Sequence, residues 1–508
     1  MGMRFFLPVV GVVMFTSALH AQVRPPAVAG AFYPGSKEEL QRDVRGFLAM
    51  PPQGQTPVAV IAPHAGYVFS GATAGKAFAP LAGSTVKRII LLGPSHYVGF
   101  SGGALPAPGT TAFATPLGDM PLDRAAVAQL ARFSEFAGPA AAHEREHCLE
   151  VELPFLQATF GAAPIVPVLI GGSTDLRTAA ALARRLADLV GPGTLVVVSS
   201  DFTHHGASYG HSPFGRGPEV GPKLLQLGRA TAERAAAIDA RGFAQQVEVA
   251  GDTVCGAAPI TVLLELLAHA FDGSGRVVEV TTSAEVSANW SQVVTYAGVD
   301  FVGAWRPWRE DEPAPRLGQL NPEEKKAALA LARATLETYL THEGQLAAWF
   351  AGNRVAGNLR ANAGVFVTIN NRGAKAKSEG RLRGCIGVME AREPLVDAIV
   401  SAATSAARDP RFPPLEASEL SGVGLEISVL SPMQRISGPE AIVLRTHGVL
   451  LSKGGRHAVF LPQVATETGW DLPTFLSQLS VKAGMSPDAW KAGATFEVFT
   501  AQVFGEPE

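Results

Sequence analysis

A proline-rich, polar segment divides this chain of 508 residues into two parts with different patterns. The segment spans residues 304–320, with the sequence AWRPWREDEPAPRLGQL, and no hydrophobic period runs through it. That composition is typical of a linker between folded units. Because a chain of this length exceeds what one ordinary hydrophobic core organises, we expect one domain over residues 22–303 and a second over 321–508.

The first part alternates short apolar runs with longer stretches of helical spacing. The runs are continuously apolar and rich in valine, isoleucine and leucine, which indicates strands buried on both faces. This alternation favours an α/β domain whose central sheet is covered on both sides. The expected strands are 58–62, 88–92, 165–170 and 195–198, and the expected helices include 124–133, 176–190 and 257–271.

The second part predicts a separate α+β domain with antiparallel strands. Asn321 can cap a helix whose first turn holds Pro322 and two glutamates, and this helix is expected to run to about Phe350. Lys453-Gly454-Gly455 is typical of a hairpin turn. The other expected elements are strands at 365–370, 425–430, 448–452 and 458–461 and helices at 393–408 and 474–483.

The charge balance and the cysteine count exclude two classes of protein. The formal net charge is −3, so a nucleic-acid binder acting through a basic surface is not expected. Three cysteines in so long a chain are too few for a disulfide framework. Cys148, Cys255 and Cys385 lie in three different sequence settings and need separate explanations.

Residues 1–21 have the pattern of an export signal. Arg4 precedes an apolar run from Phe5 to Phe15, and mostly small residues follow up to Ala21. Cleavage after Ala21 would leave no stable membrane span and would place the protein in the periplasm or outside the cell. The alternatives are an uncleaved membrane anchor, for which the run is short, or a cytoplasmic protein.

Three expected strands end beside chemically useful side chains. The runs VAVIAP and IILLGPS lead to His64 and His96, and LVVVSS leads to Asp201, with His204 shortly after it. In open α/β sheets, ligands bind beyond the carboxyl ends of the strands. We therefore expect these side chains to share one rim, although each of them alone is more simply explained as a structural residue.

Cys255 completes a candidate metal site. It stands at the start of an expected helix, where a thiol has a lowered pKa and can bind metal as thiolate. The imidazoles of His64 and His96 with one thiolate leave positions open for water or substrate. This donor set predicts one metal ion and shifts the preference toward Cu(I), Zn(II) or a thiolate-bound Fe(II). Asp201 and His204 are then expected either to support the ligands from beside them or to act in acid–base chemistry.

The charged segment EREHCLEVELP (144–154) offers one more candidate. His147 is a possible further member of the site, whereas Cys148 is expected to be a buried thiol outside the ligand set. Two other histidines, His205 and His211, are expected on the surface.

The segment GRLRGCIGVME (380–390) is the most distinctive one in the second part. Cys385 and Arg383 could form a reactive thiol beside cationic groups, or an anion-binding turn. The alternative is a tight glycine-rich strand or turn with a buried cysteine, which is favoured because no histidine or acid partner stands nearby in the sequence.

Six segments of the first part resemble the Memo family in order and spacing. The family is also called component B of the AmmeMemoRadiSam set, and it is similar in fold to class III extradiol dioxygenases of the LigB type. The resemblance implies an iron or copper site at His64, His96 and Cys255, with Asp201 and His204 beside it, and a redox role. It does not imply ring cleavage, because the dioxygenases have a carboxylate in place of the cysteine. The segments are RPPAVAGAFYP (24–34), APHAGYVFSG (62–71), LLGPSH (91–96), EHCLEVELPFLQ (146–157), SSDFTHHG (199–206) and DTVCGAAPI (252–260).

Three segments of the second part, LRGCIG, DPRFPPL and EISVLSP, are similar to the AMMECR-type family, component A of the same set. That family implies no particular reaction, but the fusion suggests that both domains act on one substrate or pathway. A functional link to a radical-SAM enzyme is also implied, and export would put that link in doubt.

These features predict a metal-dependent redox protein or a dioxygenase-like oxidoreductase, with a small molecule or a peptide as ligand in the cleft of the first domain. Three alternatives remain open. One is a metal-binding protein without turnover, and another is a scaffold whose cleft binds a peptide. The third and weakest is metal-assisted hydrolysis, which depends on Zn(II) as the metal.

Overall fold

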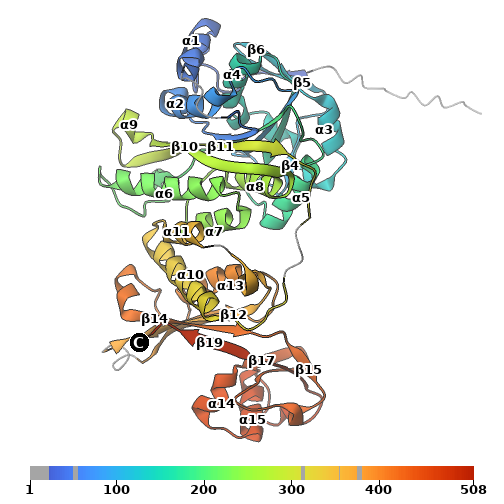
Figure 1. Ribbon diagram of the computed structural model, residues 1–508, viewed down its shortest axis with the longest axis vertical. Helices are drawn as coiled ribbons and strands as arrows, with labels where there is room; N and C mark the ends of the chain where they lie inside the picture. Colours follow the sequence, from blue (N-terminus) through green and yellow to red (C-terminus); the bar gives the residue numbers. More distant parts are fainter. Residues whose placement is uncertain (1–21, 50–54, 311–314, 354, 374–379, 508) are drawn as a thin grey trace, which may run out of the picture.

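The structure is a computed structural model that describes residues 22–49, 55–310, 315–353, 355–373 and 380–507. Two domains follow one another along the chain and lie end to end (Figure 1). The predicted signal segment 1–21 lies outside the described residues. Along the residues that are described, no helix combines the length and the apolar character needed to cross a lipid bilayer.

An eight-stranded mixed sheet forms the centre of the first domain, in the order β10-β11-β2-β8-β3-β7-β4, with β9 paired to β11. The four strands β2, β8, β3 and β7 are parallel neighbours, and they correspond to the four runs predicted from the sequence. The bounds are Ala59–Ala62 (β2), Arg88–Pro94 (β3), Gly103–Ala104 (β4), Ile165–Ile170 (β7), Thr194–Ser199 (β8) and His204–Gly206 (β9).

The central strands contribute apolar side chains to two separate clusters. Ile61 and Leu92 pack in one cluster, and their neighbours Val60 and Leu91 pack in the other. Because successive side chains of a strand point to opposite faces, a run without a polar member fills both clusters. The helices of this domain are α1 (Lys37–Leu48), α2 (Tyr67–Phe78), α3 (Arg124–Leu130), α4 (Cys148–Phe160), α5 (Leu176–Leu186), α6 (Val220–Ala236), α7 (Ala240–Ala250), α8 (Ala257–Ala270) and α9 (Ala284–Ser287).

A long antiparallel hairpin at one edge of the sheet was not predicted. Its strands are β10 (Phe271–Thr282) and β11 (Gln292–Trp305). Asp272-Gly273 belongs to this hairpin and pairs with Gly303 and its neighbour Ala304, so it is not the turn after a helix. The half-exposed β10 lacks the continuous apolar run that reveals the central strands. A smaller sheet joins β1 (Gln22–Arg24), β5 (Thr110–Thr115) and β6 (Gly118–Pro121).

Glu150 ties the start of the described chain to α4. Its carboxylate is fully buried and accepts hydrogen bonds from Arg24 Nη1 (2.8 Å), the Tyr33 hydroxyl (2.6 Å) and two backbone N–H groups. A buried carboxylate is tolerated when such donors replace water. The anchored helix α4 matters for the site because His147 immediately precedes it.

The second domain contains two four-stranded antiparallel sheets, in the orders β13-β12-β14-β19 and β15-β18-β16-β17. Both glycines of the predicted hairpin turn between β16 and β17 have positive φ. Helix α13 (Leu395–Ala406) packs on the first sheet, and two further helices are α14 (Pro462–Thr468) and α15 (Leu472–Lys482). The strands are β12 (Gly364–Asn371), β13 (Leu382–Val388), β14 (Val423–Leu430), β15 (Gln434–Ile436), β16 (Gly448–Lys453), β17 (Arg456–Phe460), β18 (Thr495–Phe499) and β19 (Ala501–Gly505).

The single helix expected from Pro322 to about Phe350 is in fact two helices. α10 spans Pro322–Thr341 and α11 spans Gln345–Gly352. His342 ends α10 in the left-handed conformation, with φ 59°, and its N–H bonds the Thr338 carbonyl at 2.8 Å. The hydrophobic spacing continues across this break, which is why the sequence does not reveal it.

The two domains share an interface that is built on α7. Val249 of α7 belongs to the hydrophobic cluster of the second domain. In the middle of the helix, Gln245 Nε2 donates to Asp397 Oδ1 (2.7 Å), and near its start Arg241 pairs with the same carboxylate (2.9 Å). Burial raises the pKa of Asp397 to about 7, while Arg241 counteracts that shift. The domains are therefore packed together and not joined only by the segment 304–320.

We predict that Glu150→Ala lowers the free energy of unfolding by about 3 kcal/mol, because it leaves the buried Arg24 guanidinium without its charge partner. Glu144→Ala, an exposed glutamate in the same segment, should change it by less than about 0.5 kcal/mol. Chemical denaturation of both variants checks this, and equal stability of the two would contradict the anchoring role.

Candidate metal centre

The residues that follow three adjacent parallel strands lie together at the carboxyl ends of those strands. His64 follows β2, His96 follows β3 and Asp201 follows β8. β8 lies between β2 and β3 in the sheet, so the three strand ends are neighbours. The sequence predicted only that each residue follows the end of a strand. The order of the strands in the sheet explains why the three residues are close together.

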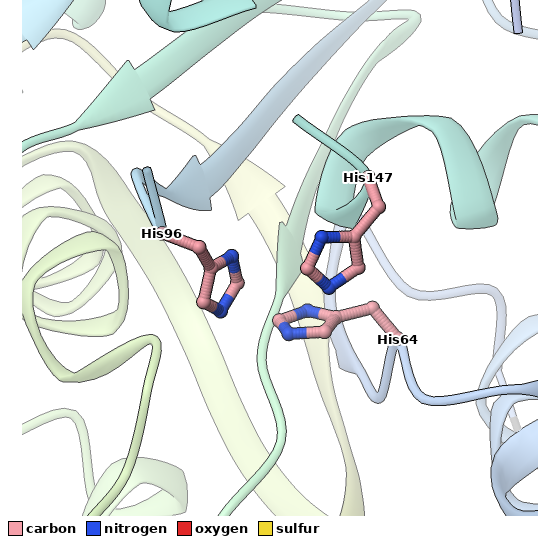
Figure 2. A group of neighbouring side chains, drawn as sticks. All are labelled: His64, His96 and His147. Carbon is pink, nitrogen blue, oxygen red and sulfur yellow. The ribbon is translucent and has the colours of Figure 1, made fainter. Parts of the chain in front are cut away.

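His64, His96 and His147 form a compact group of rings (Figure 2). One potential ligand atom from each ring lies within 4.8 Å of those of the other two. The rings of His96 and His147 are stacked, with centroids 4.6 Å apart, and His64 lies edge-on to both. His147, which the sequence indicated only as a possible member, is thus central to the group.

The ring of His64 is oriented by Ser199 at the end of β8. His64 Nδ1 lies 2.8 Å from Ser199 Oγ. That hydroxyl has two acceptors for its own proton, the Cys148 carbonyl and Glu152 Oε1, both at 2.8 Å. His64 therefore donates from Nδ1, and the lone pair on its Nε2 faces the Cys255 thiol. Burial, and next the neighbouring His96, lowers the pKa of His64 well below its ordinary value.

Glu146 orients the other two histidines. Its carboxylate lies 2.8 Å from His96 Nδ1 and accepts a hydrogen bond from the backbone N–H of the same residue at 2.8 Å. His147 Nδ1 lies 3.2 Å from the same carboxylate. Burial alone would raise the pKa of Glu146, but the hydrogen bonds from His147 and His96 hold it well below its ordinary value. A carboxylate behind Nδ1 is the usual support of a metal-binding histidine, and it leaves Nε2 for the metal.

Cys255 lies beside His64, with Sγ 3.3 Å from Nε2. It precedes α8, which begins at Ala257 as expected, so the cysteine lies just outside the helix. The expectation of a lowered thiol pKa was wrong, because burial and next the charge of Asp201 raise it. Among the described residues, the groups with three ligand atoms mutually within 4.8 Å do not include Cys255.

Asp201 and His204 lie next to this group. Asp201 Oδ1 accepts a hydrogen bond from the His64 backbone N–H at 2.9 Å, and burial raises the pKa of the Asp201 carboxyl. His204 Nδ1 lies close to the carbonyls of Phe202 (2.9 Å) and Thr253 (3.0 Å). Because both neighbours are acceptors, Nδ1 carries the proton and Nε2 of His204 is free to accept one.

Cys148 is a buried thiol, as expected. Its Sγ donates to the Pro94 carbonyl at 3.2 Å, and burial raises its pKa well above the ordinary value. It forms a second close group with His96 and Glu146. The Glu146 carboxylate is already hydrogen-bonded to His96 and His147. The group of His96, Glu146 and Cys148 therefore supports the three-histidine group and is not a separate binding site.

The donors present fit a single soft or borderline metal ion. Two imidazole nitrogens with free lone pairs and one thiol are the ligand types preferred by copper, zinc and iron. Ligand bonds of typical length at a tetrahedral centre separate S from N by roughly 3.5 Å. The 3.3 Å between Cys255 Sγ and His64 Nε2 is close to that separation.

Comparison with models of known protein families identifies a match for each of the two domains. The family model described as Memo-like protein matches residues 24–300, which is more than half of the chain. The chain belongs to the Memo-like family. A second family model, AMMECR1, matches residues 329–504, so both resemblances seen in the sequence are confirmed.

Individual relatives each match a part of this Memo-like chain. A MEMO1 family protein of Methanopyrus kandleri is 33% identical over 294 residues, which is 55% of this chain and 98% of the relative. A memo-1 homolog of Caenorhabditis elegans is 32% identical over 55% of this chain and 83% of its own length. A protein of Methanosarcina barkeri is 38% identical over 36% of this chain and 91% of its own length. The crystal structure of an uncharacterized protein from Pyrococcus horikoshii is 34% identical, covers 37% of this chain and 93% of that one, and has a TM-score of 0.32.

In the AMMECR1 domain, Arg383 makes the contacts of a structural residue. Its guanidinium is buried and donates to the carbonyls of Pro413 (2.9 Å) and Pro414 (3.2 Å). It also pairs with the Glu419 carboxylate at 2.8 Å. Arg383 therefore holds the loop that contains Pro413 and Pro414 against β13. These contacts explain the buried guanidinium without an anion ligand.

Cys385 is a half-buried residue of β13. Its thiol accepts a hydrogen bond from Thr368 Oγ1 at 3.2 Å. Its backbone N–H donates to Asp409 Oδ2 (2.9 Å), and its carbonyl accepts from Arg411 Nη2 (3.1 Å). Beside it, a Cβ on Gly384 would lie 2.3 Å from the Ala406 carbonyl oxygen. The segment is thus a tight glycine-rich strand, and a reactive role for Cys385 stays a prediction.

We expect Glu146→Gln to weaken metal binding by about 10- to 100-fold, the usual effect of removing the carboxylate behind a histidine ligand. The neutral amide keeps the size of the side chain but not its charge. Metal titration of the full chain measures the change. An affinity equal to that of the wild type would rule out Glu146 as the support of His96.

In the AMMECR1 domain, Gly384→Ala should destabilise the fold by about 2 kcal/mol or more, because the new methyl group meets a backbone oxygen that cannot move away freely. Cys385→Ala should cost clearly less, since it removes one weak hydrogen bond. Calorimetry of the full chain compares the two variants. A larger loss for Cys385→Ala than for Gly384→Ala would contradict the steric explanation given for Gly384.

Proposed function

We propose that the first domain is a metal-dependent redox protein or oxidoreductase with an open mononuclear site. The observation that carries the proposal is the convergence of His64, His96 and His147, with the Cys255 thiol 3.3 Å from His64. Fe(II) or Cu(I) suits the proposed redox role, and Zn(II) is the alternative for a non-redox role.

In this proposal His64, His96 and Cys255 hold the metal and His147 lies beside the open positions. The Nδ1 atoms of His64 and His96 are hydrogen-bonded to Ser199 and Glu146, which supports the first part because their Nε2 atoms then carry the lone pairs. Cys255 would bind as thiolate, so metal binding would release its proton. A bound metal would supply Lewis acidity or a one-electron couple to a substrate at the open positions.

His204 and Asp201 would handle protons at this site. His204 Nε2 can take a proton from a bound molecule, because Nδ1 already donates to backbone carbonyls. The buried Asp201 carboxyl, whose pKa is raised by burial, can hold a proton more readily than an exposed aspartate. The neighbouring His204 counteracts part of the effect of burial on the pKa of Asp201.

A second candidate function is a binding module for a peptide or a small molecule without turnover. Tyr97, which follows His96, is 53% exposed, and the guanidinium of Arg145 lies 5.3 Å from the centre of its ring. An exposed aromatic ring next to a cation is a common element of recognition surfaces. This candidate would retain the metal as a structural or sensing element.

We further propose that the protein is exported, from the pattern of residues 1–21. The redox role would then be carried out in the periplasm or outside the cell, without a radical-SAM partner. If residues 1–21 are retained in the cytoplasm, that partner again becomes possible. Mass spectrometry of the mature chain distinguishes the two cases by its first residue.

The decisive experiment is anaerobic metal titration of the full chain with Fe(II), Cu(I) and Zn(II). We expect one ion per chain in the wild type, and loss of most of that affinity in His64→Ala and Cys255→Ala. His457→Ala, an exposed histidine of the second domain, is the control and should bind like the wild type. Equal or absent binding in all four proteins would exclude the metal centre. Normal binding by Cys255→Ala together with loss in His147→Ala would instead give a three-histidine site.

A further inference from the structure

His342 lies where the second domain meets the loops of the metal centre. It ends α10 with φ 59°, at the break between α10 and α11. Its Nδ1 lies 2.7 Å from the Ala250 carbonyl oxygen of the first domain. Because a carbonyl only accepts, His342 donates this hydrogen bond across the domain interface.

The first loop reached by His342 leads to Cys255. Ala250 is the last residue of α7, and Gly251 continues the chain with φ 60°. Five residues after Ala250 the chain reaches Cys255. On the way, Thr253 Oγ1 donates to the His204 carbonyl and accepts from the His204 N–H, both at 2.8 Å. The position of this loop therefore affects both Cys255 and His204.

The second loop reached by His342 leads to His204. The rings of His211 and Phe214 lie 6.1 and 6.4 Å from the His342 ring, both nearly perpendicular to it. His211 is tied back to the same loop, because its carbonyl accepts from the Gly206 N–H at 2.6 Å. Burial, and next the neighbouring His342, lowers the pKa of His211 to about 4, so it is neutral at pH 7.

Two histidines of this region are less exposed than the sequence predicted. His205 was expected on the surface but is 1% exposed, and His211 is half-buried. His205, His211 and His342 are not a second metal site on the geometry of the described residues, since they form no group with ligand atoms within 4.8 Å. His211 instead contacts His342 across the domain interface, whereas His205 packs on Phe214 within the first domain.

We propose that His342 is a positioning residue for the metal centre: its ring holds the loops of His204 and Cys255, so that the AMMECR1 domain sets the geometry of the site in the Memo-like domain. This proposal rests on the proposed metal-binding function. It is supported by the fixed interface, because Val249 of α7 packs in the hydrophobic cluster of the second domain. In this proposal the fusion does more than keep the two domains close together, because the second domain positions loops of the metal centre.

The test uses the full chain with three substitutions. His342→Gly keeps the left-handed backbone and removes the ring. His342→Asn also tolerates that backbone, and its amide can donate to the Ala250 carbonyl, but it lacks the ring that contacts His211. Glu343→Ala is the control, because that carboxylate accepts a hydrogen bond from Gln345 of its own domain.

Two measurements separate positioning from general stability. Hydrogen exchange without metal should increase in 204–217 and 250–256 in His342→Gly, while His342→Asn keeps the protection of 250–256. Co(II), used as a spectroscopic probe, should bind His342→Gly about tenfold more weakly and with a changed visible spectrum. Glu343→Ala should match the wild type in both measurements.

Unchanged exchange in both loops of His342→Gly would overturn the proposal, and so would an unchanged Co(II) spectrum and affinity. If His342→Gly fails to fold, His211→Ala tests the same contact from the first domain. It should increase exchange in 204–217 and at 338–346, and no change in either segment would overturn the proposal. A wild type that binds no Co(II) would refute the metal centre itself, whereas the exchange data would still decide whether His342 positions the loops.

Discussion

The parallel pairing of β8 between β2 and β3 is the constraint on which the metal centre depends. It places the ends of three strands side by side, so that His64, Asp201 and His96 emerge at neighbouring points. It also brings Ser199, the last residue of β8, against Nδ1 of His64. A shift of β8 by one residue would turn Ser199 to the opposite face of the sheet and remove the support of that ring.

Around this sheet, the supporting residues come from segments that are far apart in the sequence. Glu146 and His147 precede α4, which Glu150 anchors to the start of the described chain. Cys255 comes from the turn between α7 and α8. The site is therefore assembled from five separate segments, and its geometry depends on how the helices pack on the sheet as well as on the strand ends.

The sequence was sufficient where local patterns decide the structure. Continuous apolar runs gave the four parallel strands, and their polar successors gave His64, His96 and Asp201. It was insufficient where tertiary contacts decide. The support that Glu146 gives to two histidines and the burial of Cys255 depend on chain segments that meet only in the fold. Strand β10 lacks a periodic hydrophobic signal, and the helix break at His342 interrupts a hydrophobic spacing that continues in the sequence. The charged EREHCLE segment was the one sequence signal that pointed to His147.

The contacts around Cys385 have a consequence beyond local stability. β13 lies at the edge of its sheet in the described strand order. An edge strand has unpaired backbone N–H and carbonyl groups that can pair with a strand of another molecule. Asp409 and Arg411 occupy the outward N–H and carbonyl of Cys385, in the way that a neighbouring strand would. The loop of these two residues thus shields the edge against pairing with another molecule, which would otherwise begin aggregation.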